Sequence, residues 1–504
     1  MKKIYLTILF LAGFLVTSCD MDKRPYGKLD DQNAIQSLND CLRFRNGLYG
    51  NLRAITTGSY VYATDIQADL FHGTIANGNR MGLISNGNIL SSDGNIKGYW
   101  SGLYSVINSA NYLIEKMDAL IESAIFSEKD LREMKRYEGE ARFVRAYAYY
   151  WLADHYCQTY SADKGDEAAL GLPIVTVYHP TGDNSTYPGR STLNELYSFI
   201  ESEVKTAYDA LIDYEKSNSE NIAPNASYLS SYAILAFQAR IALLKGDNAT
   251  ALAKAEEVIK SGKYPLTEIA EYETLWTKDE GTEVIFRPYM DNTELSNSTG
   301  ETYLSTNLDN ADYIPTFDVL SLYEDDGDIR FSTYFDVWEL TDSKTQAYVF
   351  KKYPGNESLK TGSQPNYMNM SKPFRTSELY LIAAEAASSS NPVLANKYLN
   401  DLRSKRIEGY ETANYTGQAL VNAIRAERQK ELLGEGFRLS DLRRWGMGFK
   451  RNPSHPENPA IENIVVKLGI ELSYEVNDHR YVWPIPSDEM QNNPQLKGQQ
   501  NPGY

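Results

Sequence analysis

Histidines and acidic residues, the side chains that most often carry acid–base catalysis or hold metal ions, form no recognisable motif in this sequence. The five histidines are dispersed, and none stands three or four residues from another. No HExxH, GxSxG, phosphate-binding or dinucleotide-binding glycine motif occurs. Among 67 acidic residues, carboxylate pairs of the glycosidase type arise by chance and stay an open alternative. We predict no catalytic residue, no metal site and no cofactor, and expect that the protein is not an enzyme.

One acidic run has the start of a calcium-binding pattern, EDDGD at 324–328. Calcium loops of this type need a bidentate glutamate at their twelfth position, and this run lacks one. We therefore interpret it as a solvated turn.

A second charged segment has the sequence RAERQKELLGEGFRLSDLRRWG. Three glutamates alternate there with three basic residues, at Glu427, Glu431, Glu435, Arg428, Lys430 and Arg438. These spacings predict ion pairs along one helix, which Gly434 and Gly436 would end. We expect Asp441 with Arg443 and Arg444 to clamp neighbouring helices. An arginine cluster that reads acidic sugars is the functional alternative.

Helical hairpins are the elements that must position any site. In residues 227–266 small and apolar side chains recur at three- and four-residue steps on both sides of a Gly-Asp-Asn break at 246–248. The span of about 35 residues is the tetratricopeptide period. Similar pairs are predicted in 377–406 and between 135–156 and 191–211. Further helices are expected at about 33–55, 98–121 and 417–433, so the fold class is all-α.

Two long stretches lack a clear helical period. Residues 56–97 are rich in Gly, Asn and Ser, and residues 265–372 mix strand-like runs (EVIFRPY, QAYVFKKY) with turns and aromatic residues. Loops of this length in a helical domain are usually functional or disordered, and their aromatic residues argue against disorder. We predict that a rigid helical scaffold presents these loops as a binding region.

The N-terminus has the pattern of a bacterial lipoprotein signal. Lys2 and Lys3 precede about thirteen apolar residues, too few to span a membrane, and small residues then precede Cys19. We predict a signal peptide at 1–18, a lipidated tether at 19–28 and one domain at 29–504, with acyl chains such as palmitate on Cys19. An ordinary secretory signal is the alternative.

The overall composition limits the kinds of partner that the protein can bind. The net charge of -17 argues against nucleic acid and anionic membrane faces. Tyrosine is frequent, at 38 residues against 16 phenylalanines, and we expect most of these rings to line helix–helix seams. Cys41 and Cys157 could pair or remain as buried thiols, and the sequence leaves both possibilities open.

Eight sequence blocks, in order along the chain, resemble one known family. They are YWSGLYSVINSANYLIEKM, GEARFVRAYAYYWLADHYC, GLPIV, LYEDDGDIR, RTSELYLIAAEA, ANKYLNDLRSKR, AIRAERQKELLGEGFRLSDLRRWG and WPIPSDEMQNNPQLKGQQNPGY. Together with the lipoprotein signal they resemble the SusD/RagB family of the Bacteroidetes, over essentially the whole mature chain.

The resemblance implies a function and a cellular location. It implies a surface lipoprotein that captures glycans for a SusC-like, TonB-dependent β-barrel in the outer membrane. It also implies about four tetratricopeptide-like helix pairs that support a loop-rich ligand region. Asp20 and Asp22 resemble the acidic cue that sends such lipoproteins to the outer face, so we expect Cys19 to anchor the protein in outer-membrane lipid, facing the exterior.

A glycan ligand directs attention to aromatic and polar side chains of the loops. An aromatic ring stacks on the C–H face of a sugar, while amide and charged groups pair with its hydroxyls. Trp338 is the residue that we most expect to stack on a sugar ring. Trp100 could equally well be a core residue, and we interpret Trp276 as a core residue. The candidate ligand-binding residues, chosen by loop location, are Tyr60, Tyr62, Asn79, Arg80, Trp100, Tyr289, Tyr303, Tyr313 and Trp338.

Three other functions stay open at this point. The same scaffold could serve a peptide-binding receptor of an oligopeptide importer. A surface hydrolase would be a different class of protein. A structural adaptor would stabilise the barrel without touching ligand.

Overall fold

The computed structural model describes residues 34–504 except 124, 220–221, 306–309, 324–326 and 470–471. The predicted signal peptide, the tether and Cys19 lie outside the described residues, and the division of the chain at 18, 28 and 29 stays a prediction. No helix of the described part is long and apolar enough to cross a membrane.

Four long helices form the N-terminal half, α2 (Leu38–Ala54), α5 (Gly94–Glu122), α6 (Glu128–Tyr156) and α7 (Leu193–Asn218). Each begins at a residue whose side chain accepts a hydrogen bond from the first turn, as Ser37 and Thr192 do in two complete capping boxes. Helix α6 packs between α5 and α7. The predicted pairing of 135–156 with 191–211 is therefore confirmed.

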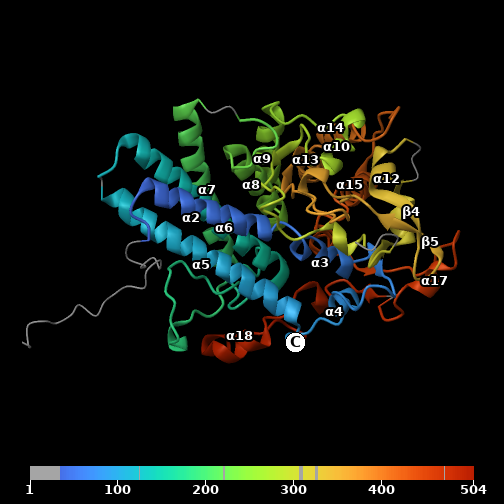
Figure 1. The fold of residues 1–504 in the computed structure, drawn as a ribbon, viewed down its shortest axis with the longest axis horizontal. Helices are drawn as coiled ribbons and strands as arrows, with labels where there is room; N and C mark the ends of the chain where they lie inside the picture. The colour runs from blue at the N-terminus through green and yellow to red at the C-terminus, as the bar shows by residue number, and fades with distance from the viewer. Residues whose placement is uncertain (1–33, 124, 220–221, 306–309, 324–326, 470–471) are drawn as a thin grey trace, which may run out of the picture.

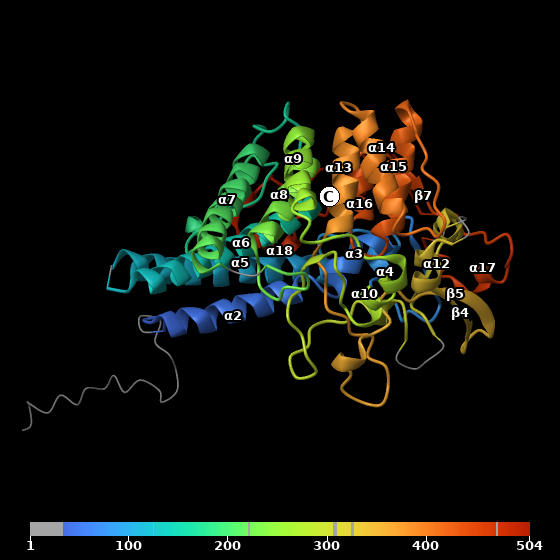
Figure 2. The ribbon, with the colours of Figure 1, turned by 90° about the horizontal axis from the view of Figure 1, so that it is seen from above.

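Shorter hairpins follow, α8 (Ser231–Lys245) with α9 (Asn248–Lys260), and α13 (Thr376–Ala387) with α14 (Pro392–Arg403). Gly246 ends α8 in the left-handed conformation, and Asp247 caps α9. Helix α9 also contacts α13, and α15 (Gly417–Glu431) packs on α13. Figure 2 shows these helices projecting side by side from one side of the molecule. The predicted all-α fold of tetratricopeptide-like hairpins is confirmed.

Within the described residues, four two-stranded antiparallel sheets lie outside the hairpins. They pair β1 (Phe71–Gly73) with β3 (Tyr313–Pro315), β2 (Val284–Phe286) with β6 (Phe374–Arg375), β4 (Phe335–Leu340) with β5 (Thr345–Phe350), and β7 (Phe449–Lys450) with β8 (Ser473–Tyr474). The strand-like runs EVIFRPY and QAYVFKKY are thus confirmed as strands β2 and β5.

Short helices occupy the rest of the chain. They are α3 (Ser59–Gln67), α4 (Gly82–Ser85), α10 (Thr274–Thr277), α11 (Phe317–Leu320), α12 (Ile329–Tyr334), α16 (Arg438–Arg444), α17 (Ile461–Ile464) and α18 (Ser487–Asn492). Helix α3 lies in a stretch read as a loop. Its residues from Tyr62 to Gln67 are all buried, so it has no polar face and no helical period that the sequence could reveal.

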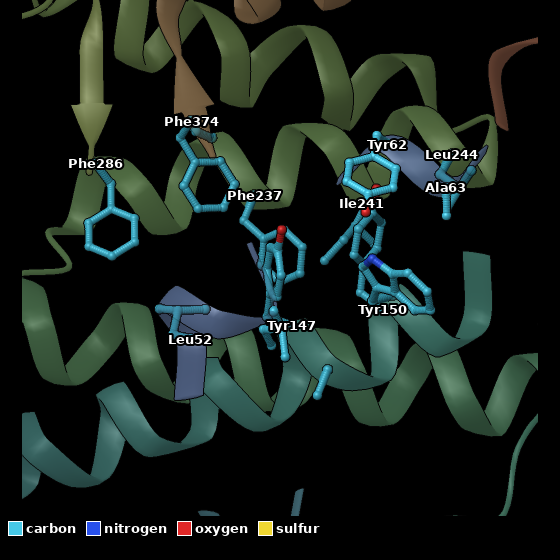
Figure 3. Packing of buried hydrophobic residues seen from close by; sticks show 14 of the residues in the cluster. Leu52, Tyr62, Ala63, Tyr147, Tyr150, Phe237, Ile241, Leu244, Phe286 and Phe374 are labelled. Carbon is cyan, nitrogen blue, oxygen red and sulfur yellow. The ribbon is translucent and has the colours of Figure 1, made fainter. Parts of the chain in front are cut away.

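One main core joins the scaffold to the loop region. Figure 3 shows Tyr147 and Tyr150 of α6 beside Phe237 of α8, with Phe374 of β6 packed against Phe237. The ring centroids of Tyr150 and Phe237 are 5.2 Å apart in an edge-to-face arrangement. Tyrosines of α6 line a helix seam, as expected. Cys41 and Cys157 are both buried free thiols.

Candidate functional site

Backbone pairing brings distant loop segments together into one surface, which we call the loop face (residues 71–80, 299–305, 310–315, 335–350 and 461–468). Strand β1 pairs with β3, so Phe71 lies opposite Pro315. Beyond β1, the Ile75 amide donates to the Ile464 carbonyl at 2.8 Å. Strand β5 lies against β3 and α17. In Figure 1 the strands β4 and β5 and helix α17 lie at the end of the molecule opposite α7.

Arg80 is the centre of a charged group on the loop face. Its guanidinium lies 3.2 Å from the Asp312 carboxylate and 3.9 Å from that of Glu301. The Arg80 side chain is 45% exposed, so it faces solvent. Burial raises the pKa of Asp312, although Arg80 opposes the shift. Exposed Asn79 precedes Arg80 in a left-handed turn. The group offers both donors and acceptors to a hydroxyl-rich ligand.

Three candidate tyrosines lie beneath this group. Tyr303 and Tyr313 have no exposed surface, and Tyr62 is also buried. The Tyr313 hydroxyl donates to the Arg80 carbonyl, while Tyr62 and Tyr303 meet edge to face at 6.3 Å. Since their ring faces are covered, these tyrosines support the loop face from below and have no free face for stacking. They are not part of the binding face proposed below.

Trp338 lies on the β4–β5 hairpin, opposite Ala347 in the register. Its ring is half-buried and packs against the main core, so part of it is open. The neighbouring Val337 is 48% exposed. The hairpin thus carries the one candidate indole that has an accessible surface and belongs to the loop face.

The other candidates lie elsewhere. Trp100 of α5 is buried against Tyr104 and Tyr156, which matches its alternative reading as a core residue. Tyr60 of α3 packs edge-on against Trp151 at 5.3 Å. Tyr289 is 51% exposed, but its carbonyl accepts from Arg53 at the end of α2, away from the loop face.

Among the described residues, Glu427, Glu431 and Glu435 form none of the ion pairs predicted along one helix, and that prediction is wrong. Glu431 instead reaches Arg406 and Arg375, each at 3.0 Å, from other elements of the fold. Glu427 pairs with Arg330 of α12 at 2.6 Å. We call the buried set the ion network; it comprises Glu283, Asp328, Arg330, Lys352, Arg375, Arg403, Arg406, Glu427, Lys430, Glu431 and Glu435.

The solvated turn predicted at 324–328 is also wrong for its last residue. The Asp328 side chain is fully buried and pairs with Arg330 and Lys430, each at 2.9 Å. Residues 324–326 lie outside the described residues. Because a buried carboxylate is stable only with close counter-charges, Asp328 forms part of the structural ion network and does not bind calcium in this arrangement.

The predicted clamp near the end of the segment is confirmed. Asp441 accepts from Arg428 of α15 at 2.7 Å and from Arg444 at 2.9 Å. Arg443 reaches Asp154 of α6 at 2.9 Å, and Arg444 reaches Glu385 of α13. Helix α16 is therefore held to the helices α6, α13 and α15 by charge-assisted hydrogen bonds. Across the described residues, no group of three or more His, Cys, Asp or Glu is placed to hold a metal ion.

Two hollows in the structure do not correspond to any pattern in the sequence. A surface groove of about 600 Å³ runs between Trp100, Tyr104 and residues 173–188. A narrower interior cleft of about 110 Å³ lies between α3, α6, α8, α16 and residues 369–373. Tyr60 lines this cleft and Trp100 lines the groove, so the candidate aromatic residues do not gather at one place.

The architecture defines a class, a helical-repeat protein whose inserted loops build one polar face. Two family models match the chain, the SusD family over residues 338–504 and a family described as starch-binding and associating with the outer membrane over residues 21–243. The chain belongs to the SusD/RagB family.

Related sequences and solved structures support the same family. SusD-like protein P38 of Formosa agariphila is 21% identical over 98% of each chain. A SusD superfamily structure from Bacteroides thetaiotaomicron is 28% identical, with a TM-score of 0.77 over 93% of this chain and 100% of that one. A putative sugar binding protein from Bacteroides vulgatus is 27% identical, with a TM-score of 0.74 over 94% and 99%.

Proposed function

We propose that the protein is a cell-surface glycan-binding lipoprotein, which captures oligosaccharides or polysaccharides on the loop face. The observation that carries the proposal is the solvent-facing group of Arg80, Glu301 and Asp312 on a loop face that also holds Trp338. The similarity to a putative sugar binding protein at 27% identity supports the same ligand class.

The chemistry of capture follows from these side chains. The Arg80 guanidinium donates to sugar hydroxyls, and the carboxylates of Glu301 and Asp312 accept from them. The open part of the Trp338 indole covers the C–H face of a sugar ring, a contact worth about 0.5–1.5 kcal/mol beyond burial. A few such contacts give affinities of roughly millimolar to micromolar, which allow release.

Anchoring and delivery complete the proposal. Acyl chains on Cys19 hold the protein to the outer leaflet of the outer membrane, with 1–18 removed, 19–28 as the tether and 29–504 as the binding domain. Each buried CH₂ contributes about 0.8 kcal/mol to such anchoring. The bound glycan passes to a SusC-like, TonB-dependent β-barrel. The description of the matched family as associating with the outer membrane supports this place.

Affinity gel electrophoresis tests the binding face. The soluble protein from Asp20 onwards is run through gels that contain one polysaccharide each. We expect retardation by one polysaccharide, and at least a tenfold loss of apparent affinity in both Trp338→Ala and Arg80→Ala. Tyr289→Ala is the matched control, since this exposed tyrosine lies away from the loop face and should leave retardation unchanged.

Two results would contradict the proposal. Retardation that is unchanged in Trp338→Ala and Arg80→Ala would move the site away from the loop face. Absence of retardation across a broad polysaccharide panel would reject glycan capture itself, and binding of peptides in the same assay would then favour the peptide receptor.

A further inference from the structure

The surface groove between α5, residues 173–188 and α18 is separate from the loop face. In Figure 1 helix α18 lies below α5, far from the strands β4 and β5. The groove volume of about 600 Å³ is within the range of roughly 300–1,000 Å³ that is usual for ligand pockets. Apolar side chains of residues 173–188 and the aromatic rings of Trp100 and Tyr104 line it. The groove can therefore hold a ligand of its own.

The backbone of residues 173–177 alternates its direction along the groove. The Tyr104 hydroxyl donates to the Pro173 carbonyl at 2.8 Å, and Asn111 donates to the Val175 carbonyl at 3.0 Å. The Val175 amide donates to a tyrosine hydroxyl of α6 at 2.7 Å. Pro173 and Val175 thus turn their backbone groups towards α5 and α6. In an extended chain, the residues between them turn theirs the other way.

Ile174 and Thr176 carry the backbone groups that point away from these helices. Among the described residues, neither amide has an acceptor, and the Ile174 carbonyl has no donor. The Thr176 carbonyl accepts from Arg145 at 3.3 Å. Both residues line the groove; Ile174 is half-buried and Thr176 is exposed. A row of unpaired backbone groups is a template to which another extended chain can add.

The carboxylate on the groove wall has no basic partner. Glu489 of α18 lines the groove, and none of the described residues that line it is a lysine or an arginine. Lys97 of α5 pairs instead with Asp488, the neighbour of Glu489 in α18. Burial raises the pKa of the Glu489 carboxyl, although hydrogen bonds with Trp100 and Asn493 oppose the shift. A partly buried carboxylate of this kind favours a ligand that brings a positive charge.

An aromatic ring near Glu489 suits a basic side chain. Trp100, which bonds to Glu489, meets Tyr104 with 5.0 Å between their ring centroids. Tyr104 is half-buried, so part of its ring is open to the groove. A lysine or arginine lays its methylene stem on apolar surface, and its cation is attracted to ring faces. The net charge of -17 also favours cationic ligands.

We propose that the groove binds a free oligopeptide in an extended conformation. The peptide backbone pairs with the open groups of Ile174 and Thr176, and one lysine or arginine side chain forms an ion pair with Glu489. A groove of this volume admits a few residues rather than a folded partner. This binding is independent of glycan capture on the loop face and adds a second class of ligand.

Isothermal titration calorimetry at pH 7 tests the groove on the soluble protein from Asp20 onwards. The probe is the acetylated and amidated pentapeptide Thr-Val-Lys-Val-Thr. Its comparison ligands are the same peptide with norleucine in place of lysine, and glucosamine. We expect the lysine peptide to bind at least tenfold more tightly than either, because it alone combines a cation with a peptide backbone. N-methylation of its backbone amides should weaken binding at least tenfold, because these amides can no longer donate to the Ile174 carbonyl.

Three variants assign the binding to the groove. Glu489→Gln should weaken the lysine peptide at least tenfold and leave the norleucine peptide unchanged, since only the charge is removed. Asp488→Asn is the matched control: it removes a charge from the preceding position of α18, which does not line the groove, so binding should stay within twofold. Ser101→Trp fills the groove from α5 without changing a charge, and it should weaken the lysine peptide at least tenfold.

Four results would overturn the proposal. They are absence of binding, equal binding of the norleucine peptide, equal binding of glucosamine, and binding by Glu489→Gln as tight as by the parent. None of these results affects polysaccharide retardation by the loop face, so failure of the groove and failure of glycan capture are distinguishable.

Discussion

Glu431 shows how much of this fold depends on single buried charges. Burial disfavours its ionised form, but Arg406, Arg375 and Arg330 hold the pKa of the Glu431 carboxyl well below its usual range. The residue is therefore charged in the folded protein at neutral pH. Removing one member of such a set leaves the others buried without enough counter-charge, which is more costly than the original pairing is favourable.

We expect Glu431→Gln to lower the free energy of unfolding by about 3–5 kcal/mol, because Arg406 and Arg375 lose their shared carboxylate. The shift of the urea midpoint, followed by circular dichroism, measures this loss. Glu357→Gln is the matched control; Glu357 is 86% exposed and faces Lys360, so its removal should cost at most about 0.5 kcal/mol. Equal shifts for the two variants would contradict a structural role of the ion network.

His155 gives a pH dependence with a defined sign. Burial lowers the pKa of the His155 imidazole from 6.5 to about 4, so between these values the unfolded chain binds a proton that the folded protein does not. The titration of His155 therefore leaves the free energy of unfolding unchanged above about pH 6.5 and lowers it as the pH falls from 6.5 towards 4. Asp65, with a pKa raised to about 7 by burial, acts in the opposite direction, so a comparison of variants is needed.

In His155→Gln, the mean slope of unfolding free energy against pH between 6.5 and 4.5 should fall by about 1 kcal/mol per pH unit. Urea denaturation at several pH values gives this slope for both proteins. A parallel displacement of the His155→Gln curve would mean that only packing was lost.

At the scale of elements, the turn between α15 and α16 lies close against α3. Gly436 adopts φ +84°, and a Cβ there would lie 2.6 Å from the Val61 carbonyl oxygen. Its amide also donates to Asp65 at 2.8 Å. Both the conformation and the lack of space require glycine at this position.

We expect Gly436→Ala to reduce stability by roughly 2–5 kcal/mol, from the left-handed conformation and from the clash with α3. Gly246→Ala is the matched control, since Gly246 has φ +78° but open space around it, and it should cost only about 1 kcal/mol. Melting temperatures of the two variants rank the effects. A smaller loss for Gly436→Ala than for Gly246→Ala would refute the close approach to α3.

The sequence predicts elements well where a helix is long and a clear break marks its end. Alanine stripes on either side of Gly246 indicate a hairpin, and α8 and α9 form it. Helix α3 is missed because it has only nine residues and no side-chain cap at its start. Spacing along α15 also misleads, because Glu427 and Glu431 find partners that are remote in sequence, such as Arg330.

The site residues were predicted less well for a related reason. Membership of a loop says nothing about the direction of a side chain. Arg80 and Trp338 have surface on the loop face, whereas Tyr303 and Tyr313 point inward and form its floor. The interior cleft depends on residues from the six helices α3, α6, α8, α10, α15 and α16, and no local pattern in the sequence brings Arg428 and Tyr60 together.

At the scale of the whole molecule, Cys41 and Cys157 do not cross-link the fold through a disulfide bond. Both thiols are buried and free, and burial raises their pKa values to about 11. We expect no thiol to react with Ellman's reagent in the native protein from Asp20 onwards, and two thiols to react after unfolding in urea. Added reductant should leave the melting temperature unchanged. A reductant-dependent fall in melting temperature would show that the two cysteines pair.

The ion network has a consequence for the order in which the chain can fold. It joins Glu283 to Glu431 and Glu435, residues separated by about 150 positions, through Arg375. Until Glu431 and Glu435 are present, Arg375 in the middle of the chain lacks two of the carboxylates with which it pairs in the folded protein. An exported chain emerges from the membrane with its N-terminus first, so the N-terminal helices can pack while the rest is still crossing. The half that carries the loop face must remain unfinished until the last third of the chain has crossed.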